Sequence, residues 1–325
     1  MFKKDYFFKE VGDIRIGATA YWKTVEDETC HHKYGIALGF HGGAFVIGSR
    51  HLIAKVEIEY LCDKGYIVVS ADYRLCPQVA VCDIIRDAID AFSWCKSDLP
   101  TKLLHDAGIE VDAGRIVAFG QSAGGLLALH LGTLREPPRA ILDFYGVKYL
   151  ADEFWHSPLP SLAGIPPFEK NLLDKIYEEP VLTTTLTSLE IMAASSARME
   201  NQPKQRGLPP PDLSIPRNAW LFTALKDGTQ IKAVVKDDAF EDVEPTMAFS
   251  PWFPPTVIIH GGADSMVPCR LSEKAFKELD QHGIETLLLV LPDQDHGFDA
   301  GLSSDDAKWQ QVRRALDFLV LNGDK

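Results

Sequence analysis

The feature that most constrains this chain is a regular alternation of apolar, β-branched runs with segments of helical periodicity. Strands are predicted at residues 13–22, 35–40, 66–73, 115–120, 139–147, 256–262 and 285–291, and helices at 79–94, 122–135, 270–282 and 305–321. Most of these strands are apolar at nearly every position, which is typical of strands buried on both sides. The pattern therefore predicts an α/β fold, with a mostly parallel central sheet and helices on both faces.

One region, residues 148–251, departs from this alternation. It has no strand signal and holds short amphipathic segments separated by the proline-rich stretch "QPKQRGLPPPDLSIP". Connections in compact domains are usually about four to six residues long, so an ordinary loop is excluded. We expect an inserted helical cap or lid at 148–251, on a catalytic core of residues 1–147 and 252–325. The alternative is a partly disordered linker, but the aromatic residues Trp155, Trp220, Phe222 and Trp252 favour a packed cap.

Composition limits the possible partners. The 325 residues are 46% hydrophobic and carry a net charge of −13 without any block of Lys or Arg, which disfavours binding to nucleic acid. The charged N-terminus does not resemble a secretory signal, and no stretch approaches the roughly 20 apolar residues of a membrane span. A cytoplasmic location is the expectation. The sequence predicts no oligomeric state.

The six cysteines show no CxxC pair and no spacing typical of metal ligands, so free thiols in a reducing compartment are predicted. The run Cys30-His31-His32 could suggest a metal site. Neighbouring side chains on an extended segment point to opposite faces, however, and no second cluster completes a coordination shell. We therefore expect a solvated loop there, and no metal.

Ser122 lies in Gly120-Gln121-Ser122-Ala123-Gly124, directly between a predicted strand and a predicted helix. This G-x-S-x-G spacing matters because a sharp turn from strand to helix forces the serine into a strained backbone conformation, where larger flanking side chains would clash. The turn exposes the hydroxyl above the carboxyl ends of the strands. A simple helix cap is the alternative for an isolated serine of this kind.

A second motif, "FHGGAFVIG" at residues 40–48, follows the predicted strand 35–40. Glycines after a strand can form a structural turn, but they can also let backbone amides approach a tetrahedral oxyanion. We assign the amides of Gly43, Ala44 and Ala123 as oxyanion donors, with Gly42 shaping the turn.

A serine hydroxyl needs a base, and the base needs an orienting acid. Asp264, in "IIHGGADSMVP", follows the strand 256–262, and His296, in "PDQDHGFD", follows the strand 285–291. Both side chains are expected at the sheet edge that carries Ser122. The chain order serine, aspartate, histidine is the one expected of an α/β-hydrolase.

Other residues compete for these roles. Asp293, Asp295 and Asp299 crowd His296 in the sequence, but adjacency does not put a carboxylate behind its ring. His260 is predicted to be a packed structural histidine. His130 lies too far along the helix after Ser122 to act as the base, and His41 is expected to brace the oxyanion loop.

With these motifs placed, the chain resembles the α/β-hydrolase superfamily, and within it the hormone-sensitive-lipase-like carboxylesterases. The residues that carry the resemblance are "HGGAF" at 41–45, "DYRL" at 72–75, "GQSAGG" at 120–125, Asp264 before "SMVP", and "DHGF" at 295–298. It departs from that branch at Ala44, at Gln121 and at Cys76-Pro77-Gln78, where a third glycine, an aspartate and "APE" are usual. The overall pattern is similar to hydrolases of filamentous fungi, some of which release or trim polyketide chains.

The resemblance implies a serine esterase that works through an acyl-enzyme without a cofactor. Its substrate would be a small-molecule ester or thioester. The aromatic residues Phe45, Trp155, Trp220, Phe222 and Phe298 are candidates for an apolar acyl pocket, with core packing as the alternative for each.

Several functions remain open at this point. The first is a carboxylesterase, and the second is a hydrolase or thioesterase that releases or trims a polyketide or other secondary-metabolite chain, with an acyl-carrier or synthase partner. A non-catalytic ligand-binding protein on the same fold is a third. A lyase or acyltransferase that uses the same serine is a fourth.

Overall fold

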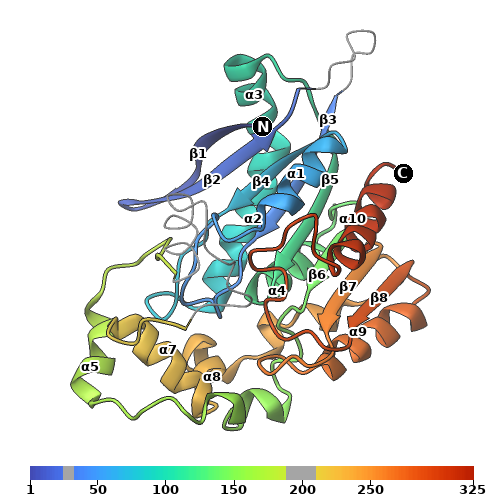
Figure 1. The fold of residues 1–325 in the computed structure, drawn as a ribbon. Coiled ribbons are helices and arrows are strands. Elements are labelled where there is room, and N and C mark those ends of the chain that lie inside the picture. The colour runs from blue at the N-terminus through green and yellow to red at the C-terminus, as the bar shows by residue number, and fades with distance from the viewer. Residues whose placement is uncertain (25–32, 188–209) are drawn as a thin grey trace.

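The computed structural model describes residues 1–24, 33–187 and 210–325. Its centre is one eight-stranded sheet with the order β1-β2-β4-β3-β5-β6-β7-β8 (Figure 1). The strands are β1 (Phe2–Val11), β2 (Ile14–Trp22), β3 (Tyr34–Phe40), β4 (Tyr66–Ala71), β5 (Val111–Gln121), β6 (Ile141–Phe144), β7 (Thr256–Gly261) and β8 (Thr286–Leu291). The strands β3 to β8 are parallel, whereas β1 and β2 are added antiparallel. The predicted mostly parallel sheet is confirmed.

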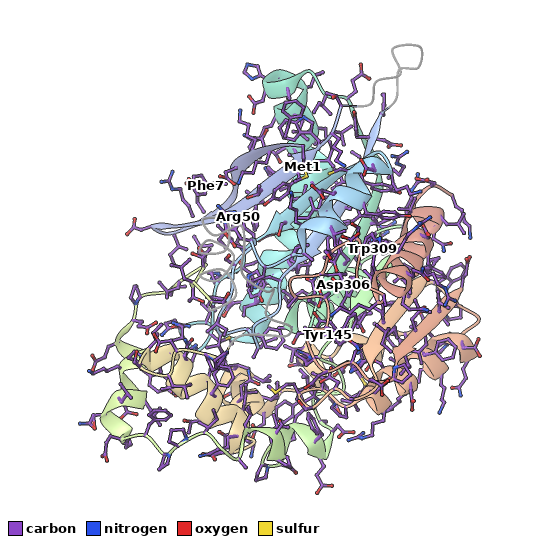
Figure 2. The ribbon with its side chains drawn as sticks, in the orientation of Figure 1. Met1, Phe7, Arg50, Tyr145, Asp306 and Trp309 are labelled. Carbon is purple, nitrogen blue, oxygen red and sulfur yellow. The ribbon has the colours of Figure 1, made fainter. Side chains whose placement is uncertain are left out.

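Strand β1 was not predicted from the sequence. It carries polar residues on both faces and forms an edge of the sheet, so it lacks the apolar signature of the central strands. Its Phe7 is 56% exposed and points away from the molecule (Figure 2). Its position comes from antiparallel pairing with β2, which sequence periodicity does not report.

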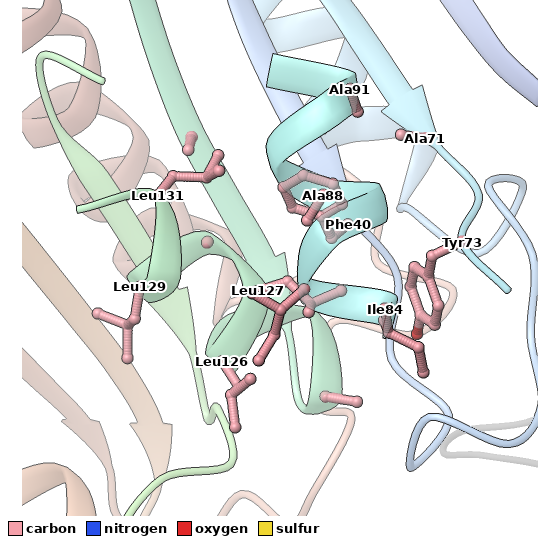
Figure 3. Packing of buried hydrophobic residues seen from close by; sticks show 14 of the residues in the cluster. Phe40, Ala71, Tyr73, Ile84, Ala88, Ala91, Leu126, Leu127, Leu129 and Leu131 are labelled. Carbon is pink, nitrogen blue, oxygen red and sulfur yellow. The ribbon is translucent and has the colours of Figure 1, made fainter. Parts of the chain in front are cut away.

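Helices cover both faces of the sheet. On one face lie α2 (Val81–Ser97), α4 (Ala123–Leu131) and α9 (Cys269–Gln281), and on the other lie α1 (Lys55–Asp63) and α10 (Trp309–Gly323). Helix α3 (Leu99–Ala107) packs beside α2. Figure 3 shows the core layer between the sheet and the face that carries α2 and α4. There Phe40 of β3 and Leu127 of α4 pack with Ile84 and Ala88 of α2. Alternate residues of each strand face opposite layers, which is why the central strands are apolar throughout.

Between β6 and β7 the described residues, 148–187 and 210–251, contain helices and turns but no strand. The helices are α5 (Lys170–Asp174), α7 (Pro216–Lys226) and α8 (Gln230–Val234), with short 3-10 turns between them. They lie beyond the carboxyl ends of the parallel strands (Figure 1). The segment "SLEIMAASSARM" at 188–199 lies outside the described residues.

The aromatic residues of this region divide into two groups. Trp155 and Trp220 are buried and Phe222 is half-buried, as packing requires. Trp252 was expected to pack in the cap, and this was wrong, because its side chain is 89% exposed. It lies in a turn whose apolar contacts come from Phe249 and Phe253, whose rings pack 4.8 Å apart.

The five described cysteines are free thiols, as predicted. Cys30, with His31 and His32, lies outside the described residues. Within the ranges that the structure covers, no helix is both long and apolar enough to cross a bilayer.

Candidate active site

Ser122 lies in a tight turn between β5, which ends at Gln121, and α4, which begins at Ala123. Its backbone has φ 53° and ψ −115°, a strained conformation for a residue with a side chain. The flanking glycines are required by close approaches: a Cβ on Gly120 would lie 2.1 Å from the Gly124 carbonyl oxygen, and one on Gly124 would lie 2.1 Å from the Phe40 carbonyl oxygen. The local sequence therefore permits the turn, and the turn presents the hydroxyl at the carboxyl edge of the sheet.

Two loops bring the predicted partners to this hydroxyl. His296, from the loop after β8, places Nε2 at 3.0 Å from Ser122 Oγ. Asp264, from the loop after β7, accepts a hydrogen bond from His296 Nδ1 at 2.8 Å. The order serine, imidazole, carboxylate is the arrangement in which a base can accept the serine proton while the acid holds the ring.

Asp264 is fully buried, and its carboxylate is well supplied with donors. Its Oδ1 accepts the backbone amides of Met266 and Val267 at 2.9 and 2.8 Å. His260 Nε2 lies 3.2 Å from Oδ2, the same oxygen that accepts His296 Nδ1. Burial raises the pKa of Asp264, but the hydrogen bonds from His260 and His296 outweigh it, and the pKa lies well below the usual carboxyl value. Asp264 is therefore ionised in the folded protein at neutral pH.

The competing acids lie elsewhere. Asp295 accepts hydrogen bonds from Ser265 and from the backbone amide of His296, so it faces the main chain rather than the ring. Asp293 is exposed in the same loop. Asp299 accepts a hydrogen bond from the Tyr145 hydroxyl.

The competing histidines are also accounted for. His130, on α4, is buried, and its Nε2 lies 2.8 Å from the Val243 carbonyl oxygen. His41 is the first residue of the loop after β3. It is buried, and its ring stacks on that of Tyr73 with centroids 4.2 Å apart. Burial lowers the pKa of His41 to about 4, so the ring is neutral and its Nδ1–H can donate to the Gly42 carbonyl at 2.7 Å.

The loop after β3 has an unusual backbone. Gly43, Ala44 and Phe45 have φ values of 118°, 54° and 66°, and a Cβ on Gly43 would lie 1.9 Å from the Ile47 carbonyl oxygen. Successive backbone N–H groups in a tight turn can form a concave surface that binds an anion. Of the hydrogen bonds among the described residues, none uses the amide of Gly43, Ala44 or Ala123 as a donor.

Two side chains from the region between β6 and β7 donate hydrogen bonds to this strained loop and its surroundings. Gln230 of α8 donates from Nε2 to the Ala44 carbonyl at 2.8 Å. Arg217 of α7, only 2% exposed, donates to the carbonyls of Val46 at 3.0 Å and Cys76 at 2.6 Å. Sequence reasoning missed both residues, because a glutamine and an arginine on amphipathic helices give no local signal of a buried contact.

A cavity of about 390 Å³ opens beside Ser122 and His296. Its lining is mainly apolar and includes the predicted pocket residues Phe45, Trp155 and Phe222. Gly42, Gly43 and Ala44 form part of the wall.

Two other predicted pocket residues lie elsewhere. Trp220 turns away from the cavity because it lies on the other side of α7 from Leu221 and Leu225, and its Nε1 donates to the Tyr177 hydroxyl at 3.1 Å. Phe298 packs into the core against Tyr145, with ring centroids 5.2 Å apart. Both therefore serve packing, the alternative given for them above.

A buried polar cluster behind the histidine was also missed. Gln121 donates to Glu57 at 3.2 Å, and the Tyr145 ring, just beyond β6 (Figure 2), lies 4.7 Å from the His296 ring, centroid to centroid. Burial raises the pKa of Glu57 well above its usual value, and the charge of Asp299 adds to the effect. Burial likewise raises the pKa of Asp299. Gln121 was the one member that the sequence marked, as a departure from the motif.

Comparisons with known proteins agree with this architecture. Residues 37–166 match a family described as having the alpha/beta hydrolase fold, and residues 219–323 match the prolyl oligopeptidase family. Among solved structures, a protein of unknown function from Staphylococcus aureus aligns over 99% of this chain and all of its own, at 17% identity and a TM-score of 0.70. Thermogutta terrifontis esterase 2 aligns over 97% of this chain and 91% of its own, at 19% identity and a TM-score of 0.61.

Curated relatives are fungal synthases. The non-reducing polyketide synthase ausA of Aspergillus calidoustus is 31% identical over 88% of this chain, and methylphloroacetophenone synthase of Cladonia uncialis is 25% identical over 97% of it. This chain spans only 13% of the length of each of these two relatives. The fold, the strand-to-helix turn at Ser122 and the family match lead to one conclusion: the chain belongs to the α/β-hydrolase superfamily.

Proposed function

We propose that the protein is a serine hydrolase that cleaves carboxylic esters or thioesters through an acyl-enzyme on Ser122. The observation that carries the proposal is the continuous hydrogen-bonded series from Ser122 Oγ to His296 at 3.0 Å and from His296 to Asp264 at 2.8 Å. A ligand-binding protein would have no use for a strained serine aligned with a base and a buried acid, so the geometry favours catalysis over the binding alternative.

The reaction follows from the positions of the groups. His296 Nε2 takes the Ser122 proton as Oγ attacks the substrate carbonyl carbon, while Asp264 holds the Nδ1 proton and stabilises the imidazolium. The amides of Gly43, Ala44 and Ala123 donate hydrogen bonds to the carbonyl oxygen and stabilise the negative charge that develops on it. The C–O or C–S bond then breaks, and His296 passes its proton to the leaving alcohol or thiol. Water, deprotonated by His296, attacks the carbonyl carbon of the acyl-enzyme. The bond from that carbon to Ser122 Oγ then breaks, His296 returns the proton to Oγ, and the acid is released.

Residues 148–251 are proposed to act as the cap over a core of residues 1–147 and 252–325. The contacts of Arg217 and Gln230 with the loop after β3 support this assignment, since they join the proposed cap to the loop that carries two of the proposed oxyanion donors. Trp155 and Phe222 of the same region would contact the acyl group.

The second candidate is the release or trimming of a polyketide chain carried as a thioester or ester. It is favoured by the names of the curated relatives, which are polyketide synthases, and by the mainly apolar cavity, which suits an uncharged aryl or acyl chain. An acyl-carrier domain or a synthase would then be the partner that delivers the substrate.

Fluorophosphonate labelling with peptide mass spectrometry tests the nucleophile, and hydrolysis of p-nitrophenyl esters and N-acetylcysteamine thioesters of increasing chain length tests the substrate. We expect labelling at Ser122 and its loss in Ser122→Ala, with Ser70→Ala, another buried serine, as the matched control. Turnover of short esters would favour a general esterase, whereas turnover of aryl thioesters alone would favour polyketide release. Absence of both labelling and turnover in the folded protein would refute the proposed function.

A further inference from the structure

A line of buried polar groups continues beyond the acid of the proposed triad. His260 Nε2, on β7, lies 3.2 Å from Asp264 Oδ2 and 2.9 Å from the Val267 carbonyl oxygen. His260 Nδ1 lies 2.7 Å from the hydroxyl of Ser272 on α9. That hydroxyl accepts a hydrogen bond from Lys148 Nζ at 3.0 Å. Lys148, His260 and Ser272 are all fully buried.

Lys148 is held by acceptors on its other sides. Its Nζ donates to the Gly146 carbonyl at 2.6 Å and lies 2.9 Å from Asp143 Oδ2. Asp143 is also fully buried, and its Oδ1 accepts the Gly146 amide at 2.7 Å. An ammonium is a donor only, so Lys148 donates hydrogen bonds to Gly146 and Ser272 and forms an ion pair with Asp143.

These contacts orient the polar hydrogens of the series. Ser272 Oγ accepts from Lys148 and keeps a hydrogen of its own, which it can donate to His260 Nδ1 at 2.7 Å. The neighbours of His260 Nε2 are a carbonyl and a carboxylate, both acceptors, so Nε2 carries the ring proton. His260 therefore presents its Nε2–H to Asp264.

We propose that Lys148, Ser272 and His260 form a positioning relay that fixes His260 as the Nε2–H tautomer and so holds the carboxylate of Asp264 behind His296. The inference rests on the proposed function, in which Asp264 orients the base. None of the three residues approaches Ser122 within hydrogen-bond distance in the described structure, so they act through Asp264 and are not catalytic residues. The roles of Lys148 and Ser272 cannot be read from any local motif.

The relay has an electrostatic consequence. The N–H of His260 takes up part of the negative charge on Asp264 Oδ2, the same oxygen that accepts His296 Nδ1. Without that donor, more negative charge faces the imidazole of His296, which then keeps its proton to higher pH. The acidic limb of any reaction that needs neutral His296 should move to higher pH.

Other titratable groups lie around His296 and Asp264. From the end of β6 comes Tyr145, from the loop after β8 come Asp295 and Asp299, and from the start of α9 comes Cys269, while Glu57 of α1 acts on Asp299. A substitution at Ser272 leaves each of these groups in place. A shift caused by Ser272→Ala therefore reports the relay.

The measurement is the second-order rate of fluorophosphonate labelling of Ser122 between pH 5 and 9, which needs no knowledge of the natural substrate. In His260→Leu, which removes the N–H that faces Asp264, the acidic limb should move up by about half to one pH unit, the equivalent of one hydrogen bond, and the plateau rate should fall several-fold. Ser272→Ala keeps that N–H but removes the hydroxyl that holds the other side of the His260 ring, so its acidic limb should move in the same direction by less. Ser70→Ala, which removes a buried hydroxyl bonded to the Arg50 carbonyl, is the matched control and should follow the wild-type profile.

Two variants of His260 show whether a shift comes from the N–H that faces Asp264 or from a loss of folding. His260→Gln keeps an N–H that can reach Asp264, and its acidic limb should stay near that of the wild type, whereas His260→Leu should show the full shift. Thermal unfolding identifies any variant that fails to fold. An unchanged profile in folded Ser272→Ala and His260→Leu would overturn the relay while leaving the nucleophile intact. If the wild-type protein itself is not labelled, the proposed function fails first.

Discussion

Gly124 offers the sharpest test of how the site is built. A Cβ at this position would lie 2.1 Å from the Phe40 carbonyl oxygen and 2.7 Å from that of His41. Both are backbone atoms at the end of β3, and ordinary contact needs about 3.4 Å, so Gly124→Ala must push the strand end and α4 apart by about 1 Å. Overpacking of this kind costs about 3 kcal/mol of stability.

The displacement also affects the proposed chemistry, because the atoms that must move carry the loop of Gly43 and Ala44. A misplacement of about 1 Å can reduce a rate by about 100-fold, and this is the loss expected in the kcat/KM of Gly124→Ala for p-nitrophenyl acetate. Urea unfolding measures stability, and the rates are taken where the variant is folded. Gly164→Ala is the control, since no atom lies within 4 Å of a Cβ there. Wild-type stability and activity in Gly124→Ala would refute the reasoning.

Three other predictions concern charge, anchoring and pocket size. Because burial and the charge of Asp299 raise the pKa of Glu57, the folded protein keeps a proton that the unfolded chain releases above about pH 4.5, and stability falls as pH rises above that value. Glu57→Gln should flatten this fall in urea titrations at pH 5 and pH 8, whereas Glu59→Gln on the same helix should not. Arg217→Met leaves two buried carbonyls without donors and should lower the unfolding free energy by about 3 kcal/mol, against less than about 1 kcal/mol for the half-exposed Arg270→Met. Phe222→Ala enlarges the cavity and should raise the kcat/KM ratio of long to short p-nitrophenyl esters by about tenfold; an unchanged ratio would mean that the acyl group lies elsewhere.

Local patterns were sufficient to predict most of the fold. The buried strands β3 to β8 and the helices α2, α4, α9 and α10 have uninterrupted apolar runs or clear helical periodicity. Strand β1 and helix α1 were missed, because one is an exposed edge and the other carries a buried glutamate among polar neighbours. Both elements are stabilised by contacts with the rest of the fold, which the local sequence does not report.

The same division holds for the candidate site. The sequence by itself was sufficient to predict Ser122, Asp264 and His296 as candidates, since each follows an apolar strand and parallel strands bring their carboxyl ends to one edge. It could not determine that Trp220 and Phe298 turn away from the cavity, because the facing of an aromatic side chain depends on its neighbours in space.

Tertiary structure alone decided the contacts that hold the site in place. Gln230 meets the Ala44 carbonyl across 186 residues, and Lys148 meets Ser272 across 124. No periodicity or spacing links such positions, since the chain brings them together only when the sheet and its helices have packed. A buried polar group must find a partner wherever the fold provides one, and that requirement, rather than any local motif, joins residues 148–251 and the proposed relay to the proposed triad.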